Sequence, residues 1–84
     1  MSMDAIEYRE HIEKLGLSQN AASRFLGVSE RSSRRYAQLD DKGRPINIPI
    51  PSAIEMLLRI MVKHKISVEA ACKLADIDPQ EILL

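Results

Sequence analysis

Apolar residues recur at spacings of three and four along much of the chain, which is the period of a helix that buries one face. In the first such segment Ala5, Tyr8, Ile12 and Leu15 lie on one stripe. Glycines and small polar residues interrupt the pattern where helices begin and end. The pattern predicts helices over about 3–15, 19–26, 30–37 and 52–64, followed by a shorter helix-turn unit over 67–84. We therefore expect an all-α fold, a small five-helix domain.

A turn of only a few residues separates the second and third of these helices. Ser18 is a good N-cap for the first of the pair, because its hydroxyl can accept a hydrogen bond from a free backbone N–H of the first turn. Gly27 ends that helix, since glycine enters the left-handed region without a steric penalty. Val28 places a hydrophobic side chain in the turn, and Ser29 caps the second helix of the pair.

A glutamine opens this pair, an alanine follows near the middle of its first helix, and a hydrophobe, a glycine, a second hydrophobe and a capping residue form the turn: Gln19, Ala22, Leu26, Gly27, Val28 and Ser29. These residues make the stretch resemble the helix-turn-helix of the phage-repressor-like (Cro/repressor, or XRE-type) transcriptional regulators. The resemblance implies a lambda-repressor-like fold whose second helix, about 30–37, enters the major groove of DNA. Ser23 departs mildly, since alanine is commonest there. Ser33 departs more, because a buried Val or Ile usually anchors the second helix at that position, which leaves Tyr36 as its expected main apolar contact.

The resemblance and the chemistry of DNA together assign roles to the side chains of the pair. Gln19 and the free N–H groups at the start of the first helix would face a backbone phosphate. Arg31 and Arg34 are the best candidates for a forked contact with guanine O6 and N7. Arg24 and Arg35 are expected to bind phosphates. The full set of candidate DNA-binding residues is Gln19, Arg24, Ser29, Glu30, Arg31, Ser32, Arg34, Arg35, Lys42 and Arg44.

Several members of this set have alternative roles. Glu30 either accepts a hydrogen bond from a cytosine amino group or repels phosphate and so rejects wrong sites. Ser32 and Ser33 either contact DNA or merely fill the helix. An arginine on an exposed helical face is ordinary, so each arginine has the alternative of contacting nothing.

Charge is distributed unevenly along the chain, although the formal net charge is zero. Between residues 24 and 36 four arginines stand against one acid, whereas residues 1–13 carry four acids against one arginine. The predicted second helix of the pair therefore has a basic face, and the potential at that face matters more for binding than the total charge. The zero net charge counts mildly against nucleic-acid binding, because such domains often carry a basic excess.

Residues 38–51 interrupt the helical pattern. A turn signal, Asp-Asp-Lys-Gly at 40–43, is followed by three prolines within seven residues, which exclude a helix and disfavour a central strand. We expect an extended arm whose isoleucines pack on the body of the domain. Either Lys42 and Arg44 reach DNA phosphates, or the segment pairs with its counterpart in a second subunit, or it is a surface connector.

The helix predicted at 52–64 begins with a capping box, because Ser52 is followed three residues later by Glu55. It is apolar nearly all the way round, and only Glu55, Arg59 and Lys63 form a polar stripe. Either it is the central core helix, buried by the other four, or a second copy of the chain covers part of it, since large exposed apolar patches usually mark interaction sites. We expect a homodimer with the interface residues Ile54, Met56, Leu57, Ile60 and Met61.

A shift of 49 residues aligns the segment 67–78 with the first helix-turn unit, placing Ser18 on Ser67 and the paired alanines of one unit on those of the other. The match is either a true internal duplication or two helix-turn pairs that obey the same local rules. Ser67 and Asp78 are expected to cap the two helices of this unit, with Pro79 at the first helical position of the second. Because no arginine follows, the unit is expected to pack or dimerise.

The chain of 84 residues is expected to be one domain with a modest core. Its parts are a DNA-reading half over 1–37, the loop over 38–51 and a packing or dimerisation half over 52–84. Cys72 is the single cysteine, which excludes an internal disulfide and suits a reducing cytoplasm, and it is expected to be a buried small hydrophobe. No apolar run is long enough to span a bilayer, so a soluble cytoplasmic protein is expected.

These features predict a sequence-specific transcriptional regulator that binds double-stranded DNA as a homodimer. The alternative is a protein-interaction or antitoxin-like module that keeps the helix-turn-helix scaffold without reading DNA, as the zero net charge and Ser33 suggest. An enzyme is not expected, because the chain has no phosphate-cradling glycine loop, no paired histidines at metal spacing and no nucleophile–base pair. No metal, cofactor or small-molecule ligand is expected.

Overall fold

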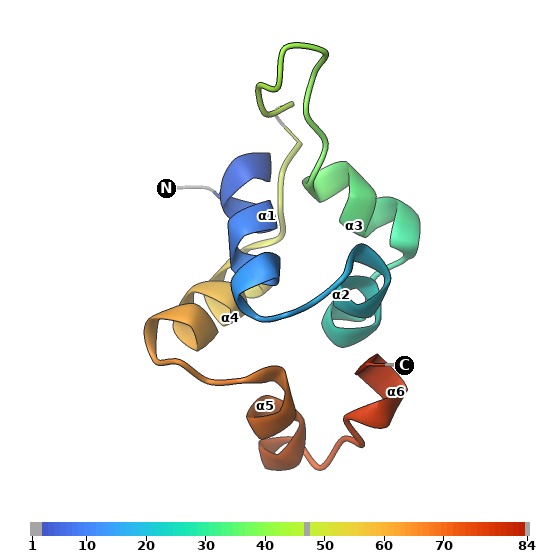
Figure 1. The fold of residues 1–84 in the computed structure, drawn as a ribbon, viewed down its shortest axis with the longest axis vertical. Coiled ribbons are helices and arrows are strands. Elements are labelled where there is room, and N and C mark those ends of the chain that lie inside the picture. Colours follow the sequence, from blue (N-terminus) through green and yellow to red (C-terminus); the bar gives the residue numbers. More distant parts are fainter. Residues whose placement is uncertain (1–2, 47, 84) are drawn as a thin grey trace.

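Six helices make up the part of the chain that the computed structural model describes, residues 3–46 and 48–83. They are α1 (Ala5–Lys14), α2 (Gln19–Leu26), α3 (Glu30–Tyr36), α4 (Ser52–Lys63), α5 (Val68–Leu74) and α6 (Gln80–Leu83) (Figure 1). The expected count of five helices is wrong by one, because the unit predicted at 67–84 forms two separate helices, α5 and α6. The backbone N–H of Gln80 donates a hydrogen bond to Asp78, the expected cap of the second. Within these residues no strand forms beyond an isolated bridge between Leu39 and Pro45.

The domain measures 39 × 24 × 18 Å, and the helices are distributed along its longest dimension. In the upper part of Figure 1, α1 packs on α4 and α2 packs on α3, while α5 and α6 lie at the lower end. α6 also packs on α2, so the C-terminal part contacts the first half of the chain. None of the described helices combines the length and the apolar character needed to cross a membrane.

α1 begins directly after Asp4, whose side chain accepts a hydrogen bond from the N–H of Glu7 at 2.9 Å. This cap makes the helix shorter than the predicted range of 3–15. The apolar stripe that predicted the helix faces the core, where its buried members are Ala5, Tyr8 and Ile12.

The core is aliphatic and is supplied by every helix except α3, which contributes a buried serine. Tyr8, Leu58, Met61, Cys72 and Ser33 are the largest side chains that are fully buried. The expectation that Cys72 is a buried small hydrophobe is confirmed, since only 1% of it is exposed. The apolar core consists of Met3, Tyr8, Ile12, Leu17, Ala21, Ala22, Ala37, Ile50, Ile54, Leu58, Met61, Val68, Cys72 and Ile82.

The predicted capping box at the start of α4 is wrong. Pro51 is the N-cap residue and Ser52 is already helical, with no side-chain cap hydrogen bond. Glu55 instead accepts a hydrogen bond from the backbone N–H of Met3 and forms an ion pair with Arg59 at 3.5 Å. Its carboxylate therefore joins α4 to the residue that precedes the cap of α1, rather than closing the first turn of its own helix.

One side of α4 is core and the opposite side is surface. Ile54 and Met61 are 9% and 1% exposed, and with Leu58 they pack inside the protomer. These two residues were expected at a dimer interface; they are core residues, because their spacing places them on the side of α4 that faces the core. The exposed apolar residues of the expected interface are Met56 (61%), Leu57 (40%) and Ile60 (48%).

A turn organised by Asp40 lies between α3 and α4. Its Oδ1 accepts hydrogen bonds from the backbone N–H groups of Lys42 at 2.8 Å and Arg44 at 2.9 Å. The N–H of Asp40 donates to the carbonyl of Arg44 at 2.7 Å, which brings the two arms of the turn together. Ile50 is buried, as expected for an arm that packs on the body, while Asn47 lies outside the described residues.

The backbone of the first half recurs in the second half at a shift of 49 residues. Gly16 (φ +73°) and Lys65 (φ +54°) follow α1 and α4, whereas Gly27 (φ +70°) and Asp76 (φ +57°) follow α2 and α5. The similarity therefore begins at the end of α4 and is longer than the segment 67–78 in which the sequence shows it. Two pairs of backbone hydrogen bonds share the shift: Leu17 N to Ile12 O (2.9 Å) with Ile66 N to Met61 O (2.8 Å), and Val28 N to Ser23 O (3.0 Å) with Ile77 N to Cys72 O (2.8 Å).

Candidate nucleic-acid interface

α2 and α3 are joined by the short turn that the sequence predicts. The hydroxyl of Ser18 accepts a hydrogen bond from the N–H of Ala21 at 3.1 Å, and that of Ser29 accepts one from the N–H of Ser32 at 3.0 Å. Gly27 ends α2 in the left-handed conformation. The three predictions about how this pair begins and ends are confirmed, and together these contacts fix how α3 leaves the turn.

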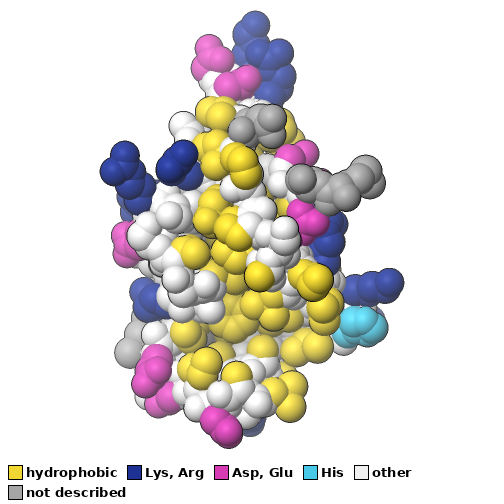
Figure 2. Space-filling model, turned by 180° about the vertical axis from the view of Figure 1, so that it is seen from behind, with side chains coloured by type: hydrophobic (Ala, Val, Ile, Leu, Met, Phe, Trp, Pro, Cys, Tyr) yellow, Lys and Arg dark blue, Asp and Glu magenta, His cyan; other side chains and the backbone are white. Residues whose placement is uncertain are grey.

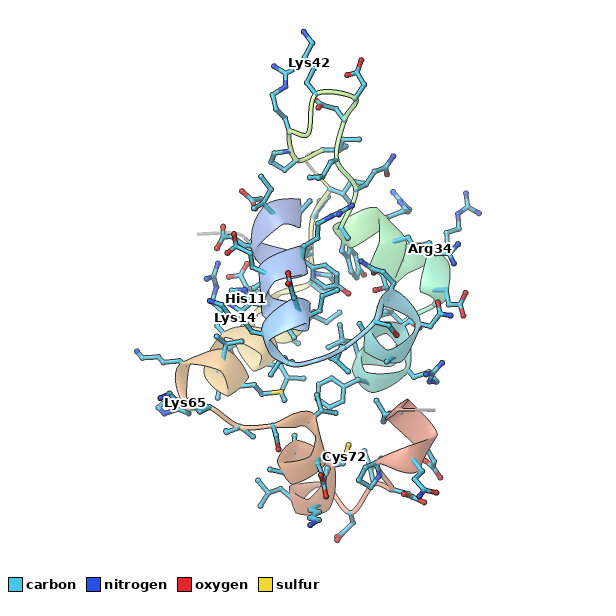
Figure 3. All side chains as sticks on the ribbon, viewed as in Figure 1. His11, Lys14, Arg34, Lys42, Lys65 and Cys72 are labelled. Carbon is cyan, nitrogen blue, oxygen red and sulfur yellow. The ribbon has the colours of Figure 1, made fainter. Side chains whose placement is uncertain are left out.

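The outer side of α3 is basic. Arg31, Arg34 and Arg35 are exposed, and with Glu30 and Gln38 they line a shallow open hollow on the surface. Arg34 extends away from the body of the domain (Figure 3). Its guanidinium lies 3.8 Å from the carboxylate of Glu30, an ion pair in which both side chains are more than half exposed and which therefore holds Arg34 only weakly.

The inner side of α3 is anchored by a polar contact instead of an apolar one. Ser33 is completely buried, and its hydroxyl lies 2.7 Å from the hydroxyl of Tyr8 and 3.0 Å from Oε1 of Gln19. Tyr36 is half-buried beside them, with its ring 5.7 Å from that of Tyr8 at an interplanar angle of 74°. The sequence prediction named Tyr36 as the main contact and missed this anchor, because a partner 25 residues away carries no local signal.

The hydroxyl of Tyr8 is held in its neutral form. Burial raises the pKa of Tyr8 above its usual value of 10.0. A neutral phenol keeps the proton that it needs as a hydrogen-bond donor, so the contact with Ser33 persists throughout the physiological pH range.

The end of α3 is held by a residue that the sequence did not identify. Nε of Arg9, on α1, donates a hydrogen bond to the carbonyl of Ala37 at 2.6 Å. The carbonyls at the end of a helix lack partners within the helix, so an arginine there both binds a carbonyl and opposes the negative end of the helix dipole. α1 therefore contacts α3 near its middle through Tyr8 and at its end through Arg9.

Arg24 contacts the C-terminal helix. Its Nε donates to the carbonyl of Ile82 at 3.0 Å, joining α2 to α6. α6 packs on α2 at this point, and Ile82 is buried. The expected contact of Arg24 with a phosphate stays a prediction. The sequence analysis assigns residues 67–84 to a unit that packs or dimerises and does not predict this contact.

Lys42 and Arg44 lie on the turn beyond α3. Lys42 is at its tip (Figure 3), while Nε of Arg44 forms an ion pair with Asp40 at 3.0 Å. Hydrogen bonds from the backbone of Arg44 and Lys42, together with the Arg44 side chain, lower the pKa of Asp40 below its usual value. Among the described residues, Lys42 at the tip of the turn has no carboxylate partner, whereas Arg44 is paired with Asp40.

The second half of the chain presents acidic side chains where the first presents arginines. Asp76, Asp78 and Glu81 are exposed around the start of α6, and α6 carries no arginine or lysine. Figure 2 shows the back of the molecule, where apolar side chains form a broad area down the middle. The excess of positive charge lies on α3, which carries three arginines against Glu30, whereas the turn at 40–44 carries two aspartates, one lysine and one arginine.

Comparison of the chain with models of known protein families, with curated proteins and with solved structures found no match to any of them. Within residues 3–46 and 48–83, no group of three or more His, Cys, Asp and Glu side chains is placed to hold a metal ion.

Proposed function

We propose that this protein is a sequence-specific DNA-binding regulator whose α2 and α3 form a helix-turn-helix, with α3 in the major groove. The observation that carries the proposal is the position of Arg31, Arg34 and Arg35 on the outer side of a helix whose inner side is fixed by the buried Ser33. An exposed helix with a fixed orientation and three guanidinium groups suits a groove lined by acceptors and bordered by phosphates.

The arginines of α3 divide by their place along the helix. Arg31 and Arg34 are assigned to base edges, because early residues of the second helix reach bases in helix-turn-helix proteins and a guanidinium can bind guanine O6 and N7 together. Arg35 is assigned to a phosphate. Glu30, close to Arg34, would orient that guanidinium or reject phosphates.

The first turn of α2 supplies a second contact in this proposal. The hydroxyl of Ser18 occupies only the N–H of Ala21, so the N–H groups of Gln19 and Asn20 point from the positive end of the helix dipole toward a backbone phosphate. Lys42, at the tip of the turn, would bind a more distant phosphate. Such contacts position the protein without reading sequence.

A homodimer follows from the exposed side of α4. Met56, Leu57 and Ile60 are exposed apolar residues on one side of a helix, and a second copy of the chain is the occupant that this proposal requires. Two copies would place their α3 helices about 34 Å apart on successive major grooves of a palindromic site.

The proposal is tested by measuring binding to random duplex DNA and to a duplex selected from a random pool. Arg34→Ala is expected to cost about 1–3 kcal/mol on the selected duplex and to relax the preference at one base pair. Arg35→Ala is expected to weaken all duplexes alike and to lower the slope of log affinity against log salt by about 0.9. Lys63→Ala, which removes one exposed charge on α4, is the matched control and should leave both quantities unchanged.

Two results would contradict the proposal. One is an absence of binding to any duplex at low salt by a folded wild-type protein. The other is an Arg34→Ala variant whose affinity and base preference equal those of the Lys63→Ala control. The dimer is tested separately by sedimentation: Met56→Glu should shift the protein to monomer, whereas Leu74→Glu, at an 82% exposed apolar residue of α5, should not.

The second candidate is a protein-interaction module on the same scaffold, and one observation favours it. An apolar hollow lined by Phe25, Leu57, Cys72, Ile77 and Ile82 shares Leu57 with the exposed side of α4, and the proposed contacts with DNA give this hollow no role. A protein that stays oligomeric in solution but fails to bind duplex DNA at low salt would favour this candidate.

A further inference from the structure

Tyr8, Ser33 and Gln19 form a chain of hydrogen bonds whose direction follows from counting protons. Ser33 Oγ donates to Oε1 of Gln19 at 3.0 Å. A serine hydroxyl has one proton, so in the 2.7 Å contact with Tyr8 the phenol donates and Ser33 accepts. Tyr8 and Ser33 are both 0% exposed, so water cannot take the place of either partner.

The same count fixes which end of the Gln19 amide faces inward. With the amide reversed, its NH₂ group would donate to Ser33, and either the phenol or the serine would then hold a buried proton with no acceptor in the described part of the chain. Such an orphan donor carries the full desolvation penalty of the group. With Oε1 inward, the phenol proton has Ser33 Oγ as its acceptor and the serine proton has Gln19 Oε1.

The NH₂ group of Gln19 therefore points away from the buried pair. Gln19 is the first residue of α2 and is half-buried, so its side chain starts in the turn where the backbone N–H groups of the helix are open. An acceptor at this position is met by two side-chain N–H donors and the positive end of the helix dipole. The chain provides no acceptor for this NH₂ group within residues 3–46 and 48–83.

We infer that Tyr8 and Ser33 are positioning residues that turn the Gln19 amide outward as a donor to a DNA phosphate. The inference rests on the proposed function, because it names the acceptor as a backbone phosphate. It assigns to the serine a role that an apolar anchor cannot perform, since Val or Ile at this position would leave the amide free to rotate. The buried pair thus couples the packing of α3 to the first turn of α2.

A double-mutant cycle on DNA affinity tests the inference. Gln19→Ala is expected to weaken binding by about tenfold, the loss of one hydrogen bond to a charged group. Ser33→Ala should weaken it by several-fold in the wild-type background and by less than about twofold when Gln19 is already alanine, because the serine acts through the amide. Neither change removes a charge, so the salt slope should stay that of the wild type.

Ser33→Ala leaves the buried hydroxyl of Tyr8 without its acceptor and so also lowers the stability of the fold. The loss of stability must therefore be separated from the loss of Gln19 positioning. The variant Tyr8→Phe/Ser33→Ala removes the donor and acceptor together and should restore most of the stability while DNA affinity stays low. Gln19→Glu keeps an oxygen for Ser33 but replaces the outward donor with an oxygen. It should retain the fold and bind DNA more weakly than Gln19→Ala does.

The outcomes distinguish this inference from the proposed function. Wild-type binding with strictly additive effects of Gln19→Ala and Ser33→Ala overturns the positioning role and leaves DNA binding intact. Recovery of affinity in Tyr8→Phe/Ser33→Ala along with stability also overturns it, since a purely structural role predicts that result. Failure of the folded wild type to bind any duplex removes the proposed function, and the inference with it.

Discussion

Gly27 and Asp76 adopt the same left-handed backbone conformation at turns that lie 49 residues apart in the chain. The first follows α2 and the second follows α5, and each N–H donates to the carbonyl three residues earlier. Glycine adopts this conformation without strain, and aspartate tolerates it. Lys65 also adopts it, at the turn after α4 that corresponds to Gly16, and its long side chain does not relieve the strain. The second half thus has the same backbone turns as the first, but with residues that adopt the left-handed conformation less readily than glycine.

Lys65→Gly is expected to stabilise the protein. Relief of the left-handed strain contributes more than the extra freedom that glycine gives the unfolded chain, for a net gain of about 0.5–1 kcal/mol in the free energy of unfolding. Denaturant titration measures the change. Gly16→Lys makes the reverse exchange at the equivalent turn and should lower stability; equal stabilities for the two variants would contradict the argument.

Ser67→Ala and Ser52→Ala should differ in stability although both serines lie at helix starts. Ser67 accepts a hydrogen bond from the N–H of Ala70 at 3.0 Å, so its loss should cost about 1 kcal/mol. Ser52 makes no cap hydrogen bond, so its replacement should change the free energy of unfolding by less than about 0.5 kcal/mol. Equal losses in thermal unfolding would show that α4 does begin with a capping box.

Arg24→Ala should loosen α6. The guanidinium binds the carbonyl of Ile82, and its loss should raise the hydrogen-exchange rate of the α6 amides more than that of the α1 amides. Arg31→Ala removes an arginine from the exposed side of α3 and serves as the control, which should leave α6 exchange unchanged. A slope of log affinity against log salt that is lower in Arg24→Ala than in the wild type would support the expected phosphate contact.

Alkaline solutions should weaken the fold through Tyr8. Because the pKa of Tyr8 is raised in the folded state, its contribution is fully present below the pKa of an unfolded tyrosine, near 10.0, and is lost as the pH rises through the higher folded value. The unfolding temperature of the wild type should therefore fall more steeply above that pH than the unfolding temperature of Tyr8→Phe. Parallel curves for the two proteins would show that the phenol ionises without cost to the fold.

Local rules predicted the features of this protein that depend on neighbouring residues. Ser18, Ser29, Ser67 and Gly27 begin or end helices where expected, because a cap involves groups within three or four residues of one another. The capping box predicted at Ser52 and Glu55 also involves neighbouring residues, but it does not form. Glu55 instead accepts a hydrogen bond from Met3, 52 residues away in the chain. Local patterns thus indicate which bonds are possible and the packing of helices decides which form.

The candidate site divides in the same way. The exposure of Arg31, Arg34 and Arg35 follows from the helical period of α3 and was predicted. The contacts that fix α3 were not, because Arg9 lies 28 residues from Ala37 and Tyr8 lies 25 residues from Ser33. The one sign of this contact in the sequence was Ser33, at a position where an apolar side chain is usual. Its partner Tyr8 could be identified only from the position of α1 in the structure.

Cys72 is the single thiol of the chain and is 1% exposed, so it is a natural reporter of local opening. It corresponds to Ser23 of the first half, at the same place before a left-handed turn. A thiol reagent reaches the sulfur only when α5 separates from the core, so its labelling rate measures how often the C-terminal helices open. The native protein thereby carries its own probe of that motion, with no label to be engineered.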